Sequence, residues 1–173
     1  ATAELPMITG ISPANGGKGQ YVTISGSNFG DSIGQVQFVK DDDLSKMYIA
    51  EPGCSQGAWN NAQVVVKVPS KIPAASIGKY TVQIVKGEVK SNQVMFDVNT
   101  KSVTPGICYV KPANGPAGTK IEIGGEEFGS SQGDKGRVVF YNGAEVKDGL
   151  VWATGKISNI IVGCLLIGYG ALR

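Results

Sequence analysis

The chain has 173 residues, of which 42% are hydrophobic and 17% charged, a composition typical of a globular protein and not of a disordered one. Its 16 basic and 14 acidic residues leave a net charge of +2, so it lacks the basic surplus of a nucleic-acid-binding protein. Histidine, the most common general base and metal ligand, is absent. We therefore predict no enzyme, no cofactor and no metal site.

Short segments with strand-like alternation make up the first 98 residues. In "QYVTISGSNFG", Val22 and Ile24 share one face, and in "GKYTVQIV" Tyr80, Val82 and Ile84 do the same. No segment has a convincing amphipathic helix pattern, and glycine, at 25 of 173 residues, supplies tight turns such as "PANG". Strands are predicted in the segments 20–30, 34–39, 62–69, 78–85 and 91–98.

An extended surface loop is predicted for 41–58, and we mark it as the candidate binding surface of this part because binding residues concentrate on loops. Asp41, Asp42 and Asp43 could bind calcium as a carboxylate cluster. They lack the spaced ligands and the glycine of a known calcium loop, so a solvated hairpin turn is favoured. For Cys54 an unpaired thiol is favoured over a bridge between subunits.

A short segment, "NTKSVTPG" at 99–106, reads as a linker, and after it the opening of the chain is repeated. "ITGISPANGGKGQYVTISGSNFG" at 8–30 is followed 99 positions later by "ICYVKPANGPAGTKIEIGGEEFG". Trp59 and Trp152 both precede an apolar strand in their copies. Surface tryptophans can stack on sugars, but equivalent positions in both copies favour core packing.

These motifs, with the strand that ends in Pro69 and with "GKYTVQIV" and "SNQVMFDV", resemble the IPT/TIG family. The resemblance covers residues 7–98 in full and 106 to about 161 in part. It implies early-set immunoglobulin-like sandwiches without a required disulfide, and it says little about activity. We predict an all-β chain with one sandwich at 1–98, including a short N-terminal arm, the linker at 99–106, and a second sandwich at 107–173.

The second copy is shorter than the first. After Trp152, "KISNIIV" can replace the strand at 63–68, but nothing corresponds to "SNQVMFDV", so one or two C-terminal strands are missing. Three explanations stay open: the natural chain continues beyond Arg173, a neighbouring subunit donates a strand, or the domain is reorganised. Strand donation would produce a homopolymeric filament. The candidate subunit contacts are Leu5, Met7, Ile160, Ile161, Val162, Leu165 and Leu166.

The C-terminal tail contains an uncharged run from Ile157 to Leu172. A truncated membrane anchor is disfavoured, because a spanning helix needs about 20 apolar residues and this run is rich in β-branched residues. We predict a buried strand and no membrane span. Cys108 and Cys164 could pair if the tail packs beside the strand that contains Cys108.

The chain starts at Ala1 and shows no signal-peptide pattern, which favours a processed protein of extracellular or cell-surface location. The predicted function is structural or adhesive, with self-association as the expected partner interaction. The alternative is a ligand- or carbohydrate-binding spacer cut from a larger cell-surface protein. A Rel-type nucleic-acid-binding role is disfavoured by the missing basic stripe.

Overall fold

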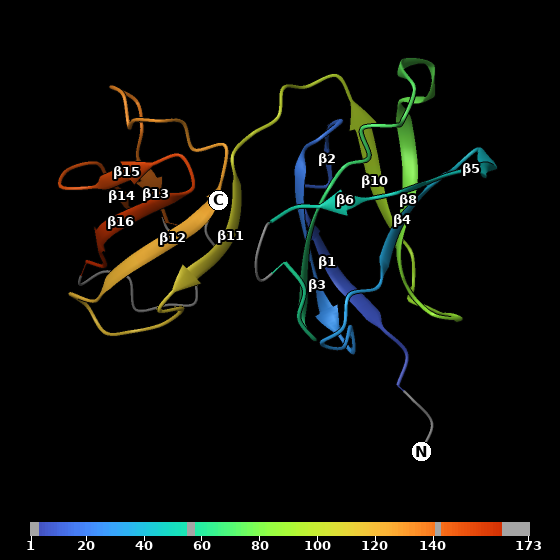
Figure 1. Ribbon diagram of the computed structural model, residues 1–173, viewed down its shortest axis with the longest axis horizontal. Helices are drawn as coiled ribbons and strands as arrows, with labels where there is room; N and C mark the ends of the chain where they lie inside the picture. Colours follow the sequence, from blue (N-terminus) through green and yellow to red (C-terminus); the bar gives the residue numbers. More distant parts are fainter. Residues whose placement is uncertain (1–3, 55–57, 141–142, 164–173) are drawn as a thin grey trace. The chain divides into compact units, whose positions relative to one another are not determined.

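The computed structural model describes residues 4–54, 58–140 and 143–163. The chain divides into two compact units, Ala1–Gly106 and Ile107–Arg173 (Figure 1). Every regular element in the described residues is a β-strand except one 3₁₀ turn at Ala74–Ser76. The predicted all-β, immunoglobulin-like fold is thereby confirmed. None of the described segments forms a helix long and apolar enough to cross a membrane.

The first unit is a sandwich of two sheets. The first sheet is antiparallel, in the order β1 (Met7–Ser12), β3 (Tyr21–Ser27), β7 (Gln63–Lys67) and β6 (Glu51–Pro52). The second sheet has the order β2 (Asn15–Gly17), β10 (Val94–Asn99), β8 (Gly78–Lys86), β4 (Gln35–Lys40) and β5 (Asp43–Ile49), with β9 (Val89–Lys90) also paired to β8. Only β2 and β10 run parallel among these described pairs.

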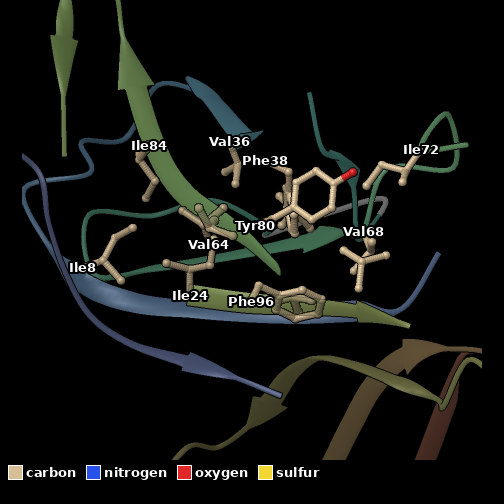
Figure 2. Packing of buried hydrophobic residues seen from close by; sticks show 14 of the residues in the cluster. Ile8, Ile24, Val36, Phe38, Val64, Val68, Ile72, Tyr80, Ile84 and Phe96 are labelled. Atoms are coloured by element: carbon tan, nitrogen blue, oxygen red, sulfur yellow. The ribbon is translucent and has the colours of Figure 1, made fainter. Parts of the chain in front are cut away.

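The core of this sandwich lies between the inner faces of the two sheets (Figure 2). Tyr80, Val82 and Ile84 are fully buried, as their alternation in the sequence predicts. Phe38 meets Phe96 edge to face, with ring centroids 5.5 Å apart. Because alternate residues of a strand point to opposite faces, the residues between these core positions form the outer face of the second sheet.

The chain changes sheets near its start. The peptide bond between Ser12 and Pro13 is cis, and the corresponding bond between Lys111 and Pro112 in the second unit is cis as well. The predicted "PANG" turn is limited to Pro13 and Ala14, because Asn15–Gly17 already forms β2 beside β10. The first unit therefore has its opening segment in both sheets.

The predicted linker is bonded to the first sandwich. Gln20 donates from Nε2 to Thr104 Oγ1 at 2.8 Å, and its Oε1 accepts the backbone N–H of Thr104 at 3.0 Å. Lys101 Nζ lies 3.1 Å from Asn15 Oδ1. Thr104 and Lys101 are thus bonded to the first sandwich in the segment that precedes Gly106, the first residue of the next strand.

The second unit contains a four-stranded and a two-stranded sheet. The first has the order β11 (Gly106–Lys111), β12 (Lys120–Glu126), β16 (Lys156–Ile161) and β15 (Val151–Ala153), and the second pairs β13 (Val138–Val139) with β14 (Glu145–Val146). The predicted strand at 156–162 is confirmed by β16, which pairs with β12 as β7 pairs with β3. The predicted lack of final strands falls on 164–173, outside the described residues.

Candidate ligand-binding face

The segment 41–58, expected to be an extended loop, is largely strand. Asp41 and Asp42 make the turn of a hairpin, and β5 and β6 follow. The loop expectation was wrong because Phe38 faces Tyr48 across the β4–β5 pair, and Tyr48 packs against the core. A half-buried tyrosine thus attaches this exposed strand to the sandwich.

The three aspartates of this hairpin do not gather around a common point. Asp43 accepts hydrogen bonds from the backbone and hydroxyl of Ser45 and lies 3.1 Å from Lys46 Nζ. The Ser45 bonds, helped by Lys46, lower the pKa of Asp43 below its ordinary value. Asp42 lies 3.6 Å from Lys40 Nζ. Within the described ranges no group of three or more Cys, Asp or Glu side chains is placed to hold a metal ion.

The cysteine of this segment differs from its expected state. Cys54 is buried and disulfide-bonded, so the prediction of an unpaired thiol is wrong. Cys108 is disulfide-bonded as well. Cys164 lies outside the described residues.

The candidate contacts of the N-terminal arm are on the surface. Leu5 and Met7 are both exposed, and Met7 is the first residue of β1, in register with Ser27.

The candidates of the C-terminal tail have different environments. Ile160 is fully buried in the core of its own unit, because it lies on the inner face of β16 opposite Ile121. Ile161 is exposed, and Val162 packs against the same core. Leu165 and Leu166 lie outside the described residues.

The two tryptophans have matching roles in the two units. Trp59 packs against the first core and donates its indole N–H to the carbonyl oxygens of Phe29 and Gly30. Trp152 packs against the second core and donates to the carbonyl oxygen of Phe128 at 2.9 Å. Both are structural side chains, as the repeat predicts, and neither ring is a free platform for a sugar.

A row of glutamines that the sequence reasoning missed crosses the outer face of the second sheet. Gln93 donates to Gln83 at 3.0 Å, Gln83 donates to Gln37 at 2.9 Å, and Gln37 donates to Gln35 at 3.4 Å. Every amide donates in the same direction along this glutamine ladder. Gln83 is only 6% exposed, Gln37 is half-buried, and the two end residues are exposed.

A second row runs beside the ladder. The strand register places Met95, Thr81, Val39 and Met47 next to one another across β10, β8, β4 and β5. Met95 and Met47 are 48% and 44% exposed, and Ile49, beside Gln37, is exposed to a similar degree. We call the glutamine ladder, this row and Ile49 together the glutamine face.

The glutamine face contains no charged residue. Lys79 and Asp97, beside it along the strands, are paired in register across β8 and β10, so their opposite charges offset one another. Across the sheet, Lys90 is in register with Val85, which in turn is in register with Gln35.

Gln35 and Gln37 are neighbours on β4, and the strand register brings Gln83 and Gln93 beside them from 46 and more positions later in the chain. The alternation of the core residues predicts that these glutamines point outward. Their contact with one another could not be predicted, because it depends on which strands are neighbours in the sheet.

An open pocket lies elsewhere in the first unit, with a volume of about 220 Å³. It is bounded by the end of β2, the 3₁₀ turn and the residues after β10, and its lining includes Lys18, Ile77 and Lys101. Of the lining residues, Lys101 already contacts Asn15.

The second unit carries a polar cluster on its four-stranded sheet. Tyr109 donates its hydroxyl to Glu122 at 2.9 Å, and Lys156 Nζ lies 3.4 Å from the other carboxylate oxygen. The Tyr109 hydrogen bond, followed by Lys156, lowers the pKa of Glu122, and the same bond raises the pKa of Tyr109. The opposite charges of Glu122 on β12 and Lys156 on β16 offset each other, and the Tyr109 hydroxyl is engaged by the same carboxylate.

The chain is similar to part of two curated bacterial enzymes. It is 29% identical over 141 residues to cyclomaltodextrin glucanotransferase of Geobacillus stearothermophilus, an alignment covering 80% of this chain and 18% of that protein. It is 32% identical over 113 residues to the same enzyme of Bacillus sp. (strain 1-1), covering 58% of this chain and 14% of that protein. The chain thus spans less than a fifth of the length of the curated relatives it matches.

Among solved structures, gamma-CGTase from alkalophilic Bacillus clarkii aligns with 95% of this chain and 27% of its own, at 16% identity and a TM-score of 0.43. The profile of the IPT/TIG domain matches residues 6–101, more than half of the chain. This match spans the first sandwich from β1 through β10. The chain belongs to the IPT/TIG domain family.

Proposed function

We propose that this chain is a non-catalytic, carbohydrate-binding module of a longer extracellular or cell-surface protein that handles glucans. The observation that carries the proposal is the 29% identity to cyclomaltodextrin glucanotransferase over 141 residues. That alignment is longer than either structural unit, so the likeness extends over parts of both. As its name says, the relative transfers glucan, and a companion module gains from holding the same polymer.

Disulfide bonding supports an extracellular location. Disulfides persist in oxidising compartments and are rare in the reducing cytosol. Both Cys54 and Cys108 are disulfide-bonded in this chain. A protein that meets polymeric carbohydrate works outside the cell, so the two observations are consistent.

The carboxylates support a non-catalytic role. Glycoside chemistry uses a pair of carboxyl groups, one of which has a raised pKa so that it can donate a proton. In the described residues the resolved carboxyl pKa shifts, at Asp43, Glu51 and Glu122, are all downward. Each of these groups is held ionised by hydrogen bonds from a neighbouring side chain, which suits a surface ion and not a general acid.

The predicted filament is a separate matter. Strand donation requires a partner for the second unit, and the residues that decide it, 164–173, lie outside the described part of the chain. It stays a prediction.

Affinity gel electrophoresis of the native chain tests the proposed function. Soluble amylose cast into the gel should retard the protein relative to a gel without polysaccharide, and maltoheptaose added to the sample should relieve the retardation. Incubation with amylose should release no new reducing ends. Unchanged mobility in amylose would contradict carbohydrate binding, and product release would contradict the non-catalytic assignment.

A further inference from the structure

We infer that the glutamine face is the surface on which a neutral glucan chain binds, an inference that rests on the function proposed above. The sugar hydroxyls would bond to the amides of the glutamine ladder. The C–H surfaces of the sugar rings would lie on Met47 and Met95. Met95, Gln83, Gln37 and Met47 lie on β10, β8, β4 and β5, so the proposed site belongs to the second sheet of the first unit.

The ladder presents unused hydrogen-bonding capacity in a fixed arrangement. A primary amide has two N–H donors and an oxygen with two lone pairs. Gln37 uses one donor toward Gln35 and one lone pair toward Gln83, which leaves one of each. Gln83 is nearly buried and bonded on both sides, so it acts as a positioning residue that holds Gln37 and Gln93 in place. Amides that are already ordered lose little side-chain entropy when a ligand binds.

The spacing of the ladder suits a linear polymer of sugars. Gln93, Gln83 and Gln37 lie on or beside three successive strands, β10, β8 and β4. Neighbouring strands are about 4.8 Å apart, a distance close to the length of one pyranose unit. A glucan lying across the strands would thus bring successive sugar units over successive amides.

The neighbouring row, which includes Met95 and Met47, supplies an apolar surface beside the ladder; we call this surface the shelf. Met95 and Met47 are two residues along their strands from the level of the ladder, which is a displacement of about 7 Å. A pyranose ring presents hydroxyls at its rim and C–H groups on its face, so it can contact the amides and the shelf together. Thioether side chains are flexible and polarizable, which allows them to conform to such a surface.

The charge of the face determines the class of ligand. Neither row contains a charged residue, Lys79 and Asp97 offset each other beside the face, and Lys90 is separated from Gln35 by Val85. The described strands therefore place no cluster of cations on the face to neutralise phosphates or carboxylates. Spare amide groups exclude a purely apolar partner, because covering them without new hydrogen bonds would cost free energy. A neutral polyhydroxylated chain satisfies both conditions.

The edge strand of this sheet disfavours the alternative in which a second chain pairs with β5 and extends the sheet. Lys46 is the central residue of β5, the edge strand beside this face. If two copies paired antiparallel along β5, the two Lys46 side chains would lie opposite each other, an arrangement that disfavours pairing.

The test compares maltoheptaose binding to the full chain and to surface variants by isothermal titration calorimetry. Met47→Lys combined with Met95→Lys removes the shelf at two exposed positions, and Gln37→Leu removes an amide from the ladder. Leu44→Lys is the matched control, because Leu44 is also on β5 and 75% exposed but lies outside the face. We expect Kd to rise at least about tenfold in the face variants and to stay unchanged in the control. Thermal unfolding should be unaltered in the double methionine variant and in the control, whereas Gln37→Leu should also lose stability because Gln83 loses its acceptor.

The other possible results distinguish an error in the proposed binding site from an error in the proposed function. If the wild-type chain binds maltoheptaose and the face variants bind equally well, the site is overturned while the proposed function stands. If the wild-type chain binds neither maltoheptaose nor amylose, the proposed function fails, and the site fails with it. If sedimentation instead shows a dimer that Met47→Lys with Met95→Lys dissociates, and no glucan binds, a second copy occupies the face and the inference is wrong.

Discussion

Trp59 donates its indole N–H to the backbone carbonyl oxygen of Phe29, 30 residues earlier in the chain, at 3.2 Å. The same side chain reaches the carbonyl oxygen of Gly30 at 3.0 Å. In the second unit Trp152 makes the corresponding bond to Phe128. In the first unit the tryptophan thereby holds the turn after β3, and in the second unit it holds the turn after β12.

Trp59→Phe tests the value of this bond. The phenylalanine keeps an aromatic ring against the core and removes the donor, which leaves two carbonyl oxygens without it. We expect the free energy of unfolding of the first unit to fall by about 1–3 kcal/mol, measured by urea unfolding followed by circular dichroism. Ile33→Ala, at an exposed position of the first unit, should change it by no more than about 0.5 kcal/mol. Equal stability of the two variants would contradict the role of the indole N–H.

Gly26 and Gly10 provide a matched pair on neighbouring strands. A Cβ at Gly26 would overlap the carbonyl oxygen of Met7 and stand 2.5 Å from the Phe29 ring, whereas a Cβ at Gly10 would meet nothing within 4 Å. Gly26→Ala should therefore lower the free energy of unfolding by about 1–3 kcal/mol. Gly10→Ala should leave it unchanged or raise it slightly, because alanine restricts the unfolded chain. Thermal unfolding of the two variants side by side measures the contrast, and equal losses would refute the steric argument.

Glu122 gives the second unit a dependence on acid pH. Its pKa is lowered from the ordinary 4.5 by the Tyr109 hydrogen bond first and by Lys156 after it. Because the folded-state pKa is the lower one, the stabilisation is fully present above the unfolded-state value and is lost as the pH falls through the folded-state value. Thermal unfolding of Glu122→Gln and the wild type should differ at neutral pH and converge in acid. If the difference in unfolding temperature between the two proteins stays constant with pH, the charge of the Glu122 carboxylate contributes nothing to stability.

Tyr80 ionises late. Its ring is buried in the first core and its hydroxyl donates to the carbonyl oxygen of Ser76 at 2.6 Å. Burial, followed by Tyr48 and Asp42, raises the pKa of Tyr80 to about 12. Spectrophotometric titration of the six tyrosines should contain one step near that value, and the step should be missing in Tyr80→Phe. Since the folded-state pKa is the raised one, the stabilisation is present below pH 10 and is lost as the pH rises through 12.

Local patterns in the sequence account for most of the fold. The alternation of Tyr80, Val82 and Ile84 predicts a strand with one buried face, and that face packs in the core. The repeat predicts equivalent roles for Trp59 and Trp152, and their hydrogen bonds agree. These features depend on a few neighbouring residues, so they are readable one segment at a time.

Features that depend on long-range pairing were missed. The strand β5 is mostly exposed and mixes polar with apolar residues, and Tyr48 is its residue that packs against the core. The glutamine ladder arises from the register of β10, β8 and β4, whose residues are separated by tens of positions in the chain. The oxidised state of Cys54 likewise depends on tertiary structure, because spacing along the chain does not determine which sulfurs meet.

The parallel pairing of β2 with β10 has a mechanical consequence. Asn15, Gly16 and Gly17 lie in register with Asp97, Val98 and Asn99, at the entrance and the exit of the first sandwich. When the ends of this unit are pulled apart, the two parallel strands are drawn in opposite directions along their length, so their hydrogen bonds share the load and must fail together. Antiparallel strands pulled at one end would instead open one bond at a time. If the proposed glucan-binding module connects a surface to a polymer, it would bear such tension, and the paired strands β2 and β10 would share it.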